Sequence, residues 1–576
     1  MDAPTNPLGP AAAAVETAAT LAPLPATTAT PRLGDALVAR GLLTEEQLAH
    51  ALDLHRRSGQ RLGRVLLSLG YVQRLDIFRV LGEAWDLPFV DLTATPVDAV
   101  LCRHFDPAVL AQEGWIPVRR LDNVVVVATS EPVRPHISAS VRDALGDDVR
   151  VRFEATTDWD VDAALRSAFR ERLTDHAANL LYDQDPMLSA RHGVTRGQKA
   201  LIALGGLIGG AALGLQPMLL LVAVLVAANL AFGASILFKV VTAMAGWHTI
   251  RRAHTREEDR IPDDELPMYT VLVPVYKEAN VVGNLVSHLR TLDYPQESLE
   301  ILLLMEEDDH ETIEAARAAH PPATVRFVIV PKGDPQTKPR ACNLGLVFAR
   351  GEFLVIYDAE DLPEPGQLRE AVSAFRNSDE DLVCVQARLN YYNAGENLLT
   401  RMFTLEYSWW FDYMLPGLDR LGLPIPLGGT SNHFRTDVLR ELGGWDAWNV
   451  TEDADLGLRA SAKGYTVGVI PSTTYEEACG RYRPWIRQRT RWIKGYMQTA
   501  LVHSRRPVST VAAAGWRGGI GLALLIAGTP LTFLAAPVMS RRSHSHRGCG
   551  SPGRATCCRA TSSCWHSPTW CSATCS

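Results

Sequence analysis

Apolar positions follow different patterns in successive parts of the chain. Leucines recur at helical spacing in residues 32–84, whereas residues 201–238 contain no charged side chain. From residue 267 to about 500, short apolar runs alternate with helical segments, as they do in an α/β domain. The pattern predicts a multidomain protein: a helical and α+β N-terminal region, transmembrane helices and an α/β domain.

Four apolar runs in the α/β region are expected to be buried strands that end in polar residues, at 270–275, 300–305, 325–330 and 353–357. The fourth run stops at Asp358, Glu360 and Asp361. Open α/β sheets bind ligands at the carboxyl ends of their strands, and clustered carboxylates suit Mg²⁺ or Mn²⁺. A solvated acidic turn is the alternative for an isolated cluster of this kind.

A repeat occupies the N-terminal region. Residues 32–43 recur 29 residues later as 61–72, each copy reading RLGxxL, then a glycine and an apolar pair. A small bundle of helix-turn-helix units explains the leucines and glycines. It does not explain why both copies begin with the same arginine.

The repeat resembles the N-terminal domain of type II secretion and pilus-assembly ATPases, of the kind that binds cyclic-di-GMP. The resemblance extends over residues 32–170 and implies an α+β half after the repeats. Two positions depart from the family pattern, because His55 and Ala84 stand where its closing glutamine is expected. No GxxxxGK[ST] loop is present, so the chain is not the ATPase itself. The resemblance implies dinucleotide contacts from both copies: Arg32, Leu33, Gly34, Arg61, Leu62 and Gly63.

The uncharged stretch is too long for one membrane span, which needs about 20 residues. It runs for 38 residues between Lys199 and Lys239 and is broken at Pro217. We therefore expect a transmembrane hairpin at 199–240 with both outer ends in the cytoplasm, because basic residues flank both. A further span is expected at 518–539.

Composition narrows the remaining possibilities. The chain has 576 residues, is 47% hydrophobic and carries a net charge of -7, which gives no case for nucleic-acid binding. Residues 1–31 hold no Lys or Arg, so they lack a secretory signal and are expected to form a disordered cytosolic arm.

The tail 541–576 holds six of the ten cysteines. Their spacing fits no zinc-binding pair of CxxC motifs, and we interpret the tail as a frameshifted reading frame.

Three more motifs follow the acidic strand ends in order. They are the GGTSNH segment 428–433, the TED segment 451–453 and the QxxRW segment 488–492. The ordered set resembles family 2 glycosyltransferases of the GT-A fold, close to bacterial cellulose-synthase-like enzymes. Together with the N-terminal repeats, it is similar to inner-membrane glycosyltransferases of phage-receptor and exopolysaccharide systems.

This resemblance implies a role for each matching residue. Glu278, Glu306 and Glu307 would hold the uridine and ribose of a UDP-sugar, with Asp308 as a competing assignment, and Lys338, Arg340 and Asn343 would lie near its diphosphate. Asp358 and Glu360 match the two acidic positions of the DxD motif and would bind the metal, with Asp361 behind them. Asp453 would be the general base beside Glu452, and the acceptor sugar would be bound by Gln488, Arg491 and Trp492.

The sequence thus predicts an inverting glycosyltransferase of the bacterial inner membrane that extends a polysaccharide and responds to cyclic-di-GMP. Its catalytic and N-terminal domains are expected in the cytosol, with an outer-membrane or periplasmic export partner. Transfer of one sugar to a lipid carrier is the alternative within the class. A catalytically silent envelope or secretion scaffold that senses the dinucleotide is the alternative outside it. The expected linker is 171–198 and the expected catalytic domain is 265–505.

Overall fold

The computed structural model describes residues 32–58, 62–253, 261–319, 321–322, 324–507, 515–516, 518–521, 523–528 and 530. The predicted arm at 1–31, Arg61 and the tail at 541–576 lie outside these residues, as does half of the predicted span at 518–539.

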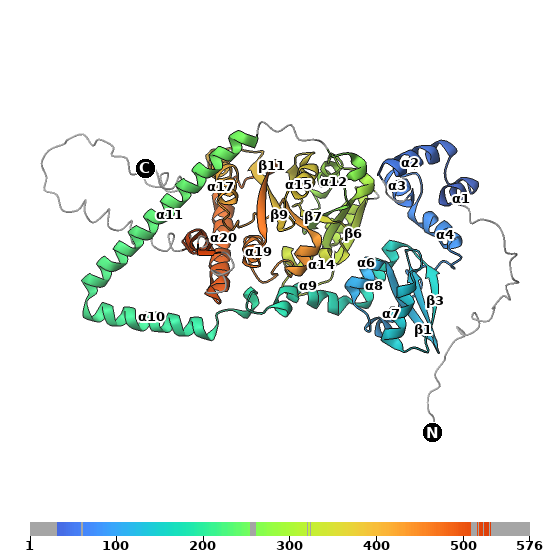
Figure 1. Cartoon of the computed structure of the whole chain (residues 1–576), viewed down its shortest axis with the longest axis horizontal. Helices are drawn as coiled ribbons and strands as arrows, with labels where there is room; N and C mark the ends of the chain where they lie inside the picture. The colour runs from blue at the N-terminus through green and yellow to red at the C-terminus, as the bar shows by residue number, and fades with distance from the viewer. Residues whose placement is uncertain are drawn as a thin grey trace, which may run out of the picture.

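The two RLG repeats form a bundle of four helices with a core of its own, at the upper right of Figure 1. Gly34 lies at a close approach between the helices of the first repeat. A Cβ at this position would lie 2.5 Å from Leu48 Cδ1, so a larger residue would require the Leu48 side chain to move. The helices are α1 Leu33–Ala39, α2 Glu45–Ser58, α3 Leu62–Ser68 and α4 Arg74–Ala84.

An α+β unit follows, as the sequence predicts. Its three-stranded sheet has the order β1-β2-β3, with β1 and β2 antiparallel and β2 and β3 parallel. The elements are α5 Ala99–Cys102, α6 Pro107–Glu113, β1 Trp115–Leu121, β2 Val124–Thr129, α7 Pro135–Leu145, β3 Arg150–Ala155 and α8 Asp158–Ala168.

The domain expected to be catalytic, which we call the catalytic domain, is built on an eight-stranded mixed sheet of order β6-β5-β4-β7-β10-β9-β11-β8. The four predicted strands are confirmed as β4 to β7 and run parallel, with β5 and β7 on either side of β4. The strands are β4 Tyr269–Val275, β5 Leu299–Glu306, β6 Val325–Val330, β7 Phe353–Ile356, β8 Leu362–Pro363, β9 Leu382–Tyr391, β10 Asn432–Arg435 and β11 Thr466–Glu476.

Helices cover this sheet and extend from it toward the apolar segment (Figure 1). They are η2 Asp263–Glu265, α12 Val282–Leu289, η3 Gln296–Ser298, α13 His310–Ala318, α14 Lys338–Phe348, α15 Gln367–Arg376, α16 Leu398–Ser408, the π-helix η4 Trp409–Met414, α17 Leu415–Arg420, α18 Thr436–Glu441, α19 Glu452–Ala462, α20 Tyr482–His503 and the π-helix η5 Ala523–Ala527.

The α+β unit and the catalytic domain share one hydrophobic core. Side chains of β4 alternate between the two faces of its sheet: Val271 and Val273 enter one core, and Leu272 enters the other. The second core also contains Trp115 and Leu165 of the α+β unit. The two units are therefore packed as one body rather than joined by a free linker.

The segment expected to be a linker carries much of this contact. It contains α9 Arg170–Gln184 and the short helix η1 Ala190–His192, and α9 packs on α14. A buried ion-pair network supports the same junction, because Arg326 of β6 contacts both Asp162 of α8 and Glu300 of β5.

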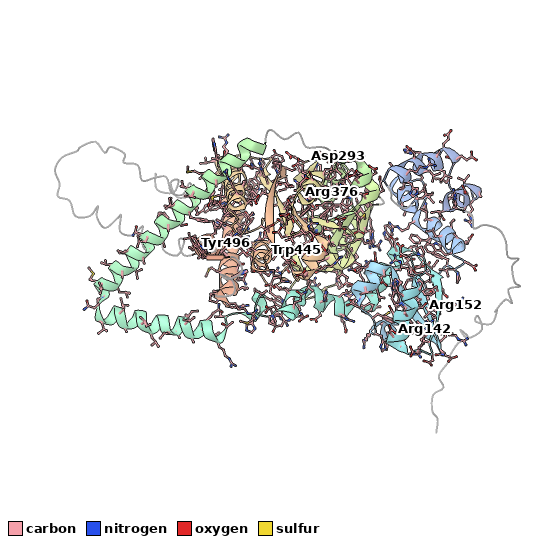
Figure 2. The ribbon with its side chains drawn as sticks, in the orientation of Figure 1. Arg142, Arg152, Asp293, Arg376, Trp445 and Tyr496 are labelled. Atoms are coloured by element: carbon pink, nitrogen blue, oxygen red, sulfur yellow. The ribbon has the colours of Figure 1, made fainter. Side chains whose placement is uncertain are left out.

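Two long apolar helices follow, α10 Arg196–Leu215 and α11 Pro217–Ala253. They meet at the predicted break before Pro217, and among the described residues they are the two helices long and apolar enough to cross a membrane. The apolar window of α10 is 0% buried and that of α11 is 6% buried, and Figure 2 shows the side chains of α10 standing clear of the rest of the protein.

The far end of α11 is fixed to the catalytic domain. A Cβ at Gly246 would lie 2.0 Å from the carbonyl oxygen of Tyr413, and one at Gly417 would lie 1.9 Å from that of Thr242. The two glycines let α11 and α17 meet backbone to backbone, so the apolar hairpin and the catalytic domain are held in a defined relation.

Candidate active site

The acidic strand ends meet at one edge of the catalytic sheet. β5, β4 and β7 are neighbours and run parallel, so the segments after their last residues lie side by side. These segments carry Glu278 after β4, Glu306 and Glu307 at the end of β5, and Asp358 after β7.

Asp361 shapes the acidic turn after β7. One carboxylate oxygen, Oδ2, accepts hydrogen bonds from the backbone N–H of Asp358 at 2.7 Å and from the hydroxyl of Thr430. The side chain is 2% exposed, and its Oδ1 is buried without a hydrogen-bond partner in the described part of the chain. Asp361 therefore fixes the turn and leaves Asp358 and Glu360 at its outer side.

Lys338 links this turn to residues 428–431, which we call the GGTS loop. Its Nζ donates to a carboxylate oxygen of Asp358 and, at 2.7 Å, to the carbonyl oxygen of Gly429. Burial opposes the charge on Lys338, but the neighbouring Asp358 raises its pKa. The lysine is thus held as a cation at the N-terminus of α14, beside the acidic turn.

Carboxylates outnumber cations around this turn. Burial and the charges of Glu360 and Asp358 raise the pKa of Glu278 to about 7, and burial and Asp358 raise the pKa of Glu360. The Oε2 atom of Glu278 is buried and has no partner among the described residues. A divalent cation would relieve this repulsion, and its preferred ligands are carboxylate oxygens.

The donor set therefore fits the predicted metal, with Asp358 and Glu360 as the residues that would hold it. The described residues contain no group of three or more His, Cys, Asp or Glu side chains arranged to hold a metal ion by themselves. A metal at this turn would complete its coordination with diphosphate oxygens and water.

Glu452 and Asp453 open helix α19 next to the GGTS loop. Asp453 Oδ1 accepts from the backbone N–H of Ala454 at 2.8 Å, and its Oδ2 lies 3.4 Å from the position of a Cβ at Gly429. Burial raises the pKa of Asp453 to about 6, and burial together with Asp453 raises that of Glu452 to about 8. Asp453 thus combines a half-buried position with the raised pKa that suits a base near neutral pH.

The QxxRW residues lie on α20, as predicted. Trp492 packs on Phe403 and Tyr407 of α16, with ring centroids 6.2 and 6.5 Å apart. Gln488 is partly buried, and its Oε1 has no partner in the described part of the chain. Arg491 is exposed.

Helix α20 packs closely against the TED segment. A Cβ at Gly495 would lie 2.3 Å from Thr451 Cγ2, and the hydroxyl groups of Thr451 and Thr499 are 3.3 Å apart. Asn449 also donates to Thr499 at 3.0 Å. α20 therefore sets the position of the segment that carries Asp453.

Arg489 was missed in the sequence, although it lies inside QxxRW. Its guanidinium lies 4.6 Å from the ring centre of Phe403 and 4.7 Å from that of Trp492, and it forms a two-point ion pair with Glu406 of α16. The arginine holds α20 to α16 and orients Trp492. The arginine-rich pattern of the helix was the only signal for it.

Arg340, Glu306 and Asn343 are buried beneath the strand ends. Arg340 is 1% exposed and donates to Glu306 at 2.8 Å and to the carbonyl oxygen of Pro331 at 2.8 Å. Asn343 is also buried and donates to the backbone carbonyls of Ala177 and Trp445. These contacts make the three side chains part of the floor beneath the strand ends.

Glu307 is bound from the N-terminal side. Arg170 of α9 donates to Glu307 Oε1 at 2.7 Å and also contacts Oε2. The competing residue, Asp308, is exposed and accepts from Gln336 at 3.1 Å. The predicted nucleotide-binding end of β5 is thus in direct contact with α9, the helix that follows the α+β unit.

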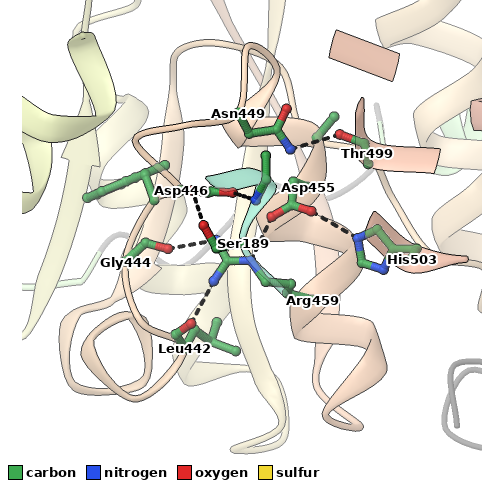
Figure 3. Close-up of polar contacts among 12 residues, drawn as sticks. Ser189, Leu442, Gly444, Asp446, Asn449, Asp455, Arg459, Thr499 and His503 are labelled. Carbon is green, nitrogen blue, oxygen red and sulfur yellow. Dashed lines mark hydrogen bonds and ion pairs between the residues drawn. The ribbon is translucent and has the colours of Figure 1, made fainter. Parts of the chain in front are cut away.

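A buried polar network ties α19 to α20 and to the segment after α9 (Figure 3). Asp455 accepts from Arg459 at 2.8 Å and contacts His503 at 3.0 Å, and Asp446 accepts from Ser189 at 3.0 Å. Burial opposes the charge on Asp455, but Arg459 and His503 lower its pKa. The network fixes the helix that begins with the candidate base.

The predicted dinucleotide-binding residues are placed at the ends of α1 and α3. Arg32 is exposed at the start of α1, followed by half-buried Leu33 and buried Gly34. Leu62 and Gly63 begin α3 and are partly buried, whereas Arg61 lies outside the described residues. A Cβ at Gly63 would lie 3.6 Å from Leu33 Cδ2, so the two copies pack against each other.

Two family models match this chain and confirm both recognised resemblances. Residues 267–495 match the family described as glycosyltransferase like family 2, and residues 85–175 match the MshEN domain. The first match includes the acidic strand ends, the TED segment and QxxRW. The second covers the α+β unit and does not include the two RLG repeats.

Curated relatives are similar to less than half of this chain each. The probable glycosyltransferase YdaM of Bacillus subtilis is 29% identical over 241 residues, which are 41% of this chain and 57% of that protein. A beta-monoglucosyldiacylglycerol synthase of Trichormus variabilis is 26% identical over 286 residues, 48% of this chain and 59% of that protein. Glucomannan 4-beta-mannosyltransferase 1 of Oryza sativa subsp. japonica is 27% identical over 243 residues, 39% of this chain and 46% of that protein. The chain thus spans about half the length of the curated relatives it matches.

Two solved structures show similarity to separate parts. The mannosyltransferase PcManGT from Pyrobaculum calidifontis, in complex with GDP-Man and Mn²⁺, covers 56% of this chain and 93% of its own, at 20% identity and a TM-score of 0.37. The structure of MshE with cdg covers 24% of this chain and 99% of its own, at 25% identity and a TM-score of 0.22.

Proposed function

We propose that this chain, which joins a family 2 glycosyltransferase domain to an MshEN domain, transfers a sugar from a UDP-sugar to a growing polysaccharide with inversion at the anomeric carbon. One observation carries the proposal: Lys338 binds both Asp358 and the carbonyl oxygen of Gly429, and Asp453 lies against Gly429. A cation, a metal-binding carboxylate and a candidate base therefore meet at one loop.

The donor's diphosphate would lie between Lys338 and the acidic turn. A divalent cation held by Asp358 and Glu360 would neutralise charge on the departing diphosphate. Lys338 supplies a second positive charge at the N-terminus of α14, where the helix dipole also favours an anion. Asp361 keeps the turn in place through Thr430 and the backbone of Asp358.

Asp453 would act on the acceptor. Its carboxylate takes the proton from the acceptor hydroxyl as that oxygen attacks the anomeric carbon, and the bond to the diphosphate breaks in the same displacement. A single displacement without a covalent intermediate inverts the configuration. Gln488, Arg491 and Trp492 would hold the acceptor sugar, with Trp492 kept in position by Arg489 and Phe403.

The apolar hairpin supports a position of this chemistry at a membrane. α10 and α11 would form a multi-pass anchor in the bacterial inner membrane, and the basic residues at both outer ends favour a cytosolic position for the N-terminal and catalytic domains. The backbone contact between Gly246 and the 413–417 segment would hold the active site close to the bilayer. A polysaccharide product would then pass to a periplasmic or outer-membrane export partner.

The N-terminal region would regulate the enzyme by binding cyclic-di-GMP. The MshEN match and the two RLG repeats support this role. A physical route to the active site also exists, because α9 contacts Glu307 through Arg170 and contacts Asn343 through the carbonyl oxygen of Ala177. Dinucleotide binding that shifted α9 would move Glu307 and Asn343, the residues of the proposed donor site that α9 contacts.

Two alternatives differ in the acceptor and in the chemistry. Transfer of one sugar to a lipid would agree with the similarity to a glycolipid synthase. Several partly buried carboxylates around one lysine cost stability when no cation or ligand is bound. This arrangement therefore favours an enzyme over a catalytically silent scaffold.

The proposal is tested by UDP release from membranes that contain the full chain, with Mn²⁺ and a panel of UDP-sugars, with and without cyclic-di-GMP. We expect one donor to be turned over and its turnover to change with the dinucleotide. A chromatographic analysis of the product separates a polysaccharide from a glycolipid. The absence of UDP release with every donor, in both conditions, would contradict the proposal.

A further inference from the structure

Glu476 is the last residue of β11 and lies opposite the acidic turn. β11 pairs antiparallel with β8, and the register matches Thr474 with Pro363 and Tyr475 with Leu362. The next step of the same register places Glu476 opposite Asp361. Residues directly opposite each other in an antiparallel pair project from the same face of the sheet.

The other neighbour of Glu476 belongs to the acceptor side of the cleft. β11 also pairs with β9, where Glu476 matches Tyr391. The ring of Tyr391 stacks on Phe403 at 5.0 Å and on Tyr407 at 4.4 Å, and these two rings contact Trp492 of QxxRW. Glu476 therefore stands between the metal-binding turn and the aromatic cluster around Trp492.

The carboxylate of Glu476 has no protein partner in the described part of the chain. Its backbone carbonyl accepts from the N–H of Tyr392 at 3.1 Å, which fixes the main chain, and its side chain is half-buried. Asp361 Oδ1, across the strand pair, is buried and has no partner among the described residues. Burial and the charges of Asp361 and Asp358 raise the pKa of Glu476. An acceptor group left unsatisfied at such a position costs stability unless a ligand supplies the donor.

The neighbouring glutamate behaves differently. Successive side chains of a strand point to opposite faces, and Glu477 is exposed and accepts from the hydroxyl of Tyr392 at 3.3 Å. The two adjacent glutamates thus differ in the face they occupy and in whether the protein satisfies them.

We propose that Glu476 accepts a hydrogen bond from a hydroxyl group of the donor sugar and so helps to select which sugar is transferred. This inference rests on the proposed function. The sugar of a donor whose diphosphate lies at Lys338 and Asp358 must extend toward the acceptor at Trp492, and Glu476 stands between these two groups. Sugar hydroxyls are hydrogen-bond donors, and a site built to hydrogen-bond a substrate hydroxyl discriminates strongly against a ligand without the matching donor.

The test compares the wild type with Glu476→Gln and Glu477→Gln in the detergent-solubilised full chain. Calorimetry with Mn²⁺ measures the affinity for UDP and for UDP-glucose, UDP-galactose and UDP-N-acetylglucosamine. For Glu476→Gln we expect UDP affinity within about twofold of wild type, and roughly tenfold weaker binding of the best UDP-sugar, because the carboxyl group that accepts the hydrogen bond is replaced by an amide. Glu477→Gln should match the wild type with every ligand.

Each other outcome would overturn the inference. Equal weakening of UDP and UDP-sugar binding would show that Glu476 acts on the diphosphate or its metal. Unchanged binding with an altered KM for the acceptor alone would place it on the acceptor side. If the wild type binds no UDP-sugar, the proposed function itself fails, and the inference falls with it. A thermal unfolding scan of each variant establishes that the protein is folded.

Discussion

Replacing Gly495 by alanine is expected to slow catalysis while leaving the protein folded. A Cβ at this position would lie 2.3 Å from Thr451 Cγ2 and 2.6 Å from its Oγ1. Carbon atoms in contact lie about 3.5–4.0 Å apart, so α20 and the TED segment would have to separate by more than about 1 Å. Thr451 is 7% exposed and β-branched, so it cannot rotate away easily. Asp453 is two residues further on.

The effect on stability should be small and the effect on turnover large. Overpacking costs about 1–3 kcal/mol, and the better helix propensity of alanine offsets about 1 kcal/mol of this cost. A displacement of about 1 Å at a positioned catalytic group can reduce the rate about 100-fold. We therefore expect a modest shift in thermal unfolding together with a fall in kcat of this order.

UDP release and thermal unfolding of the same preparations measure the two effects. Gly283→Ala is the matched control, because Gly283 is also helical and a Cβ there would meet no atom within 4 Å. Adding Thr451→Ala to Gly495→Ala removes the two nearest atoms and should restore part of the rate. A Gly495→Ala variant with wild-type kcat would refute the idea that α20 positions Asp453.

Three further predictions concern the base, the metal and the domain junction. The pKa of Asp453 is raised to about 6, and the base must be ionised to act. We therefore expect kcat/KM to fall as the pH drops through about 6, whereas an ordinary aspartate would keep kcat/KM constant down to about pH 4. A pH–rate profile with the donor that the wild type turns over checks this. Glu360→Gln should weaken Mn²⁺ binding in a metal titration and reduce donor affinity with it, and an unchanged titration would remove Glu360 from the metal site. Arg326→Met leaves Glu300 buried without its cation and Asp162 with Arg350 at 4.0 Å, and should cost about 3–5 kcal/mol, seen as a large drop in unfolding temperature. A wild-type melting curve would contradict the role given to this ion pair.

The sequence predicts those parts of the site that depend on local pattern. The runs that form β4 to β7 are short and apolar, and each is followed by polar residues, so both the strands and their functional ends can be recognised. The break before Pro217 and the helix that carries QxxRW follow from equally local signals.

The contacts that could not be predicted join residues distant in the chain. Arg340 and Glu306 are 34 residues apart, and nothing near either one shows that the arginine neutralises the glutamate in the floor of the site. The position of Glu476 near the acidic turn depends on the pairing of β11 with β8, a strand of two residues that has no periodicity to detect. The segment 171–198 is polar enough to be predicted as a linker, but its leucines and alanines pack α9 onto α14.

The most direct test of the central claim is UDP release by the full chain with Asp453→Asn, in Mn²⁺ and with the donor that the wild type turns over. The substitution keeps the shape of the side chain and removes its ability to take a proton. The account predicts UDP affinity close to wild type and a rate reduced about 10²–10⁴-fold. Equal UDP release by the wild type and by Asp453→Asn would contradict it.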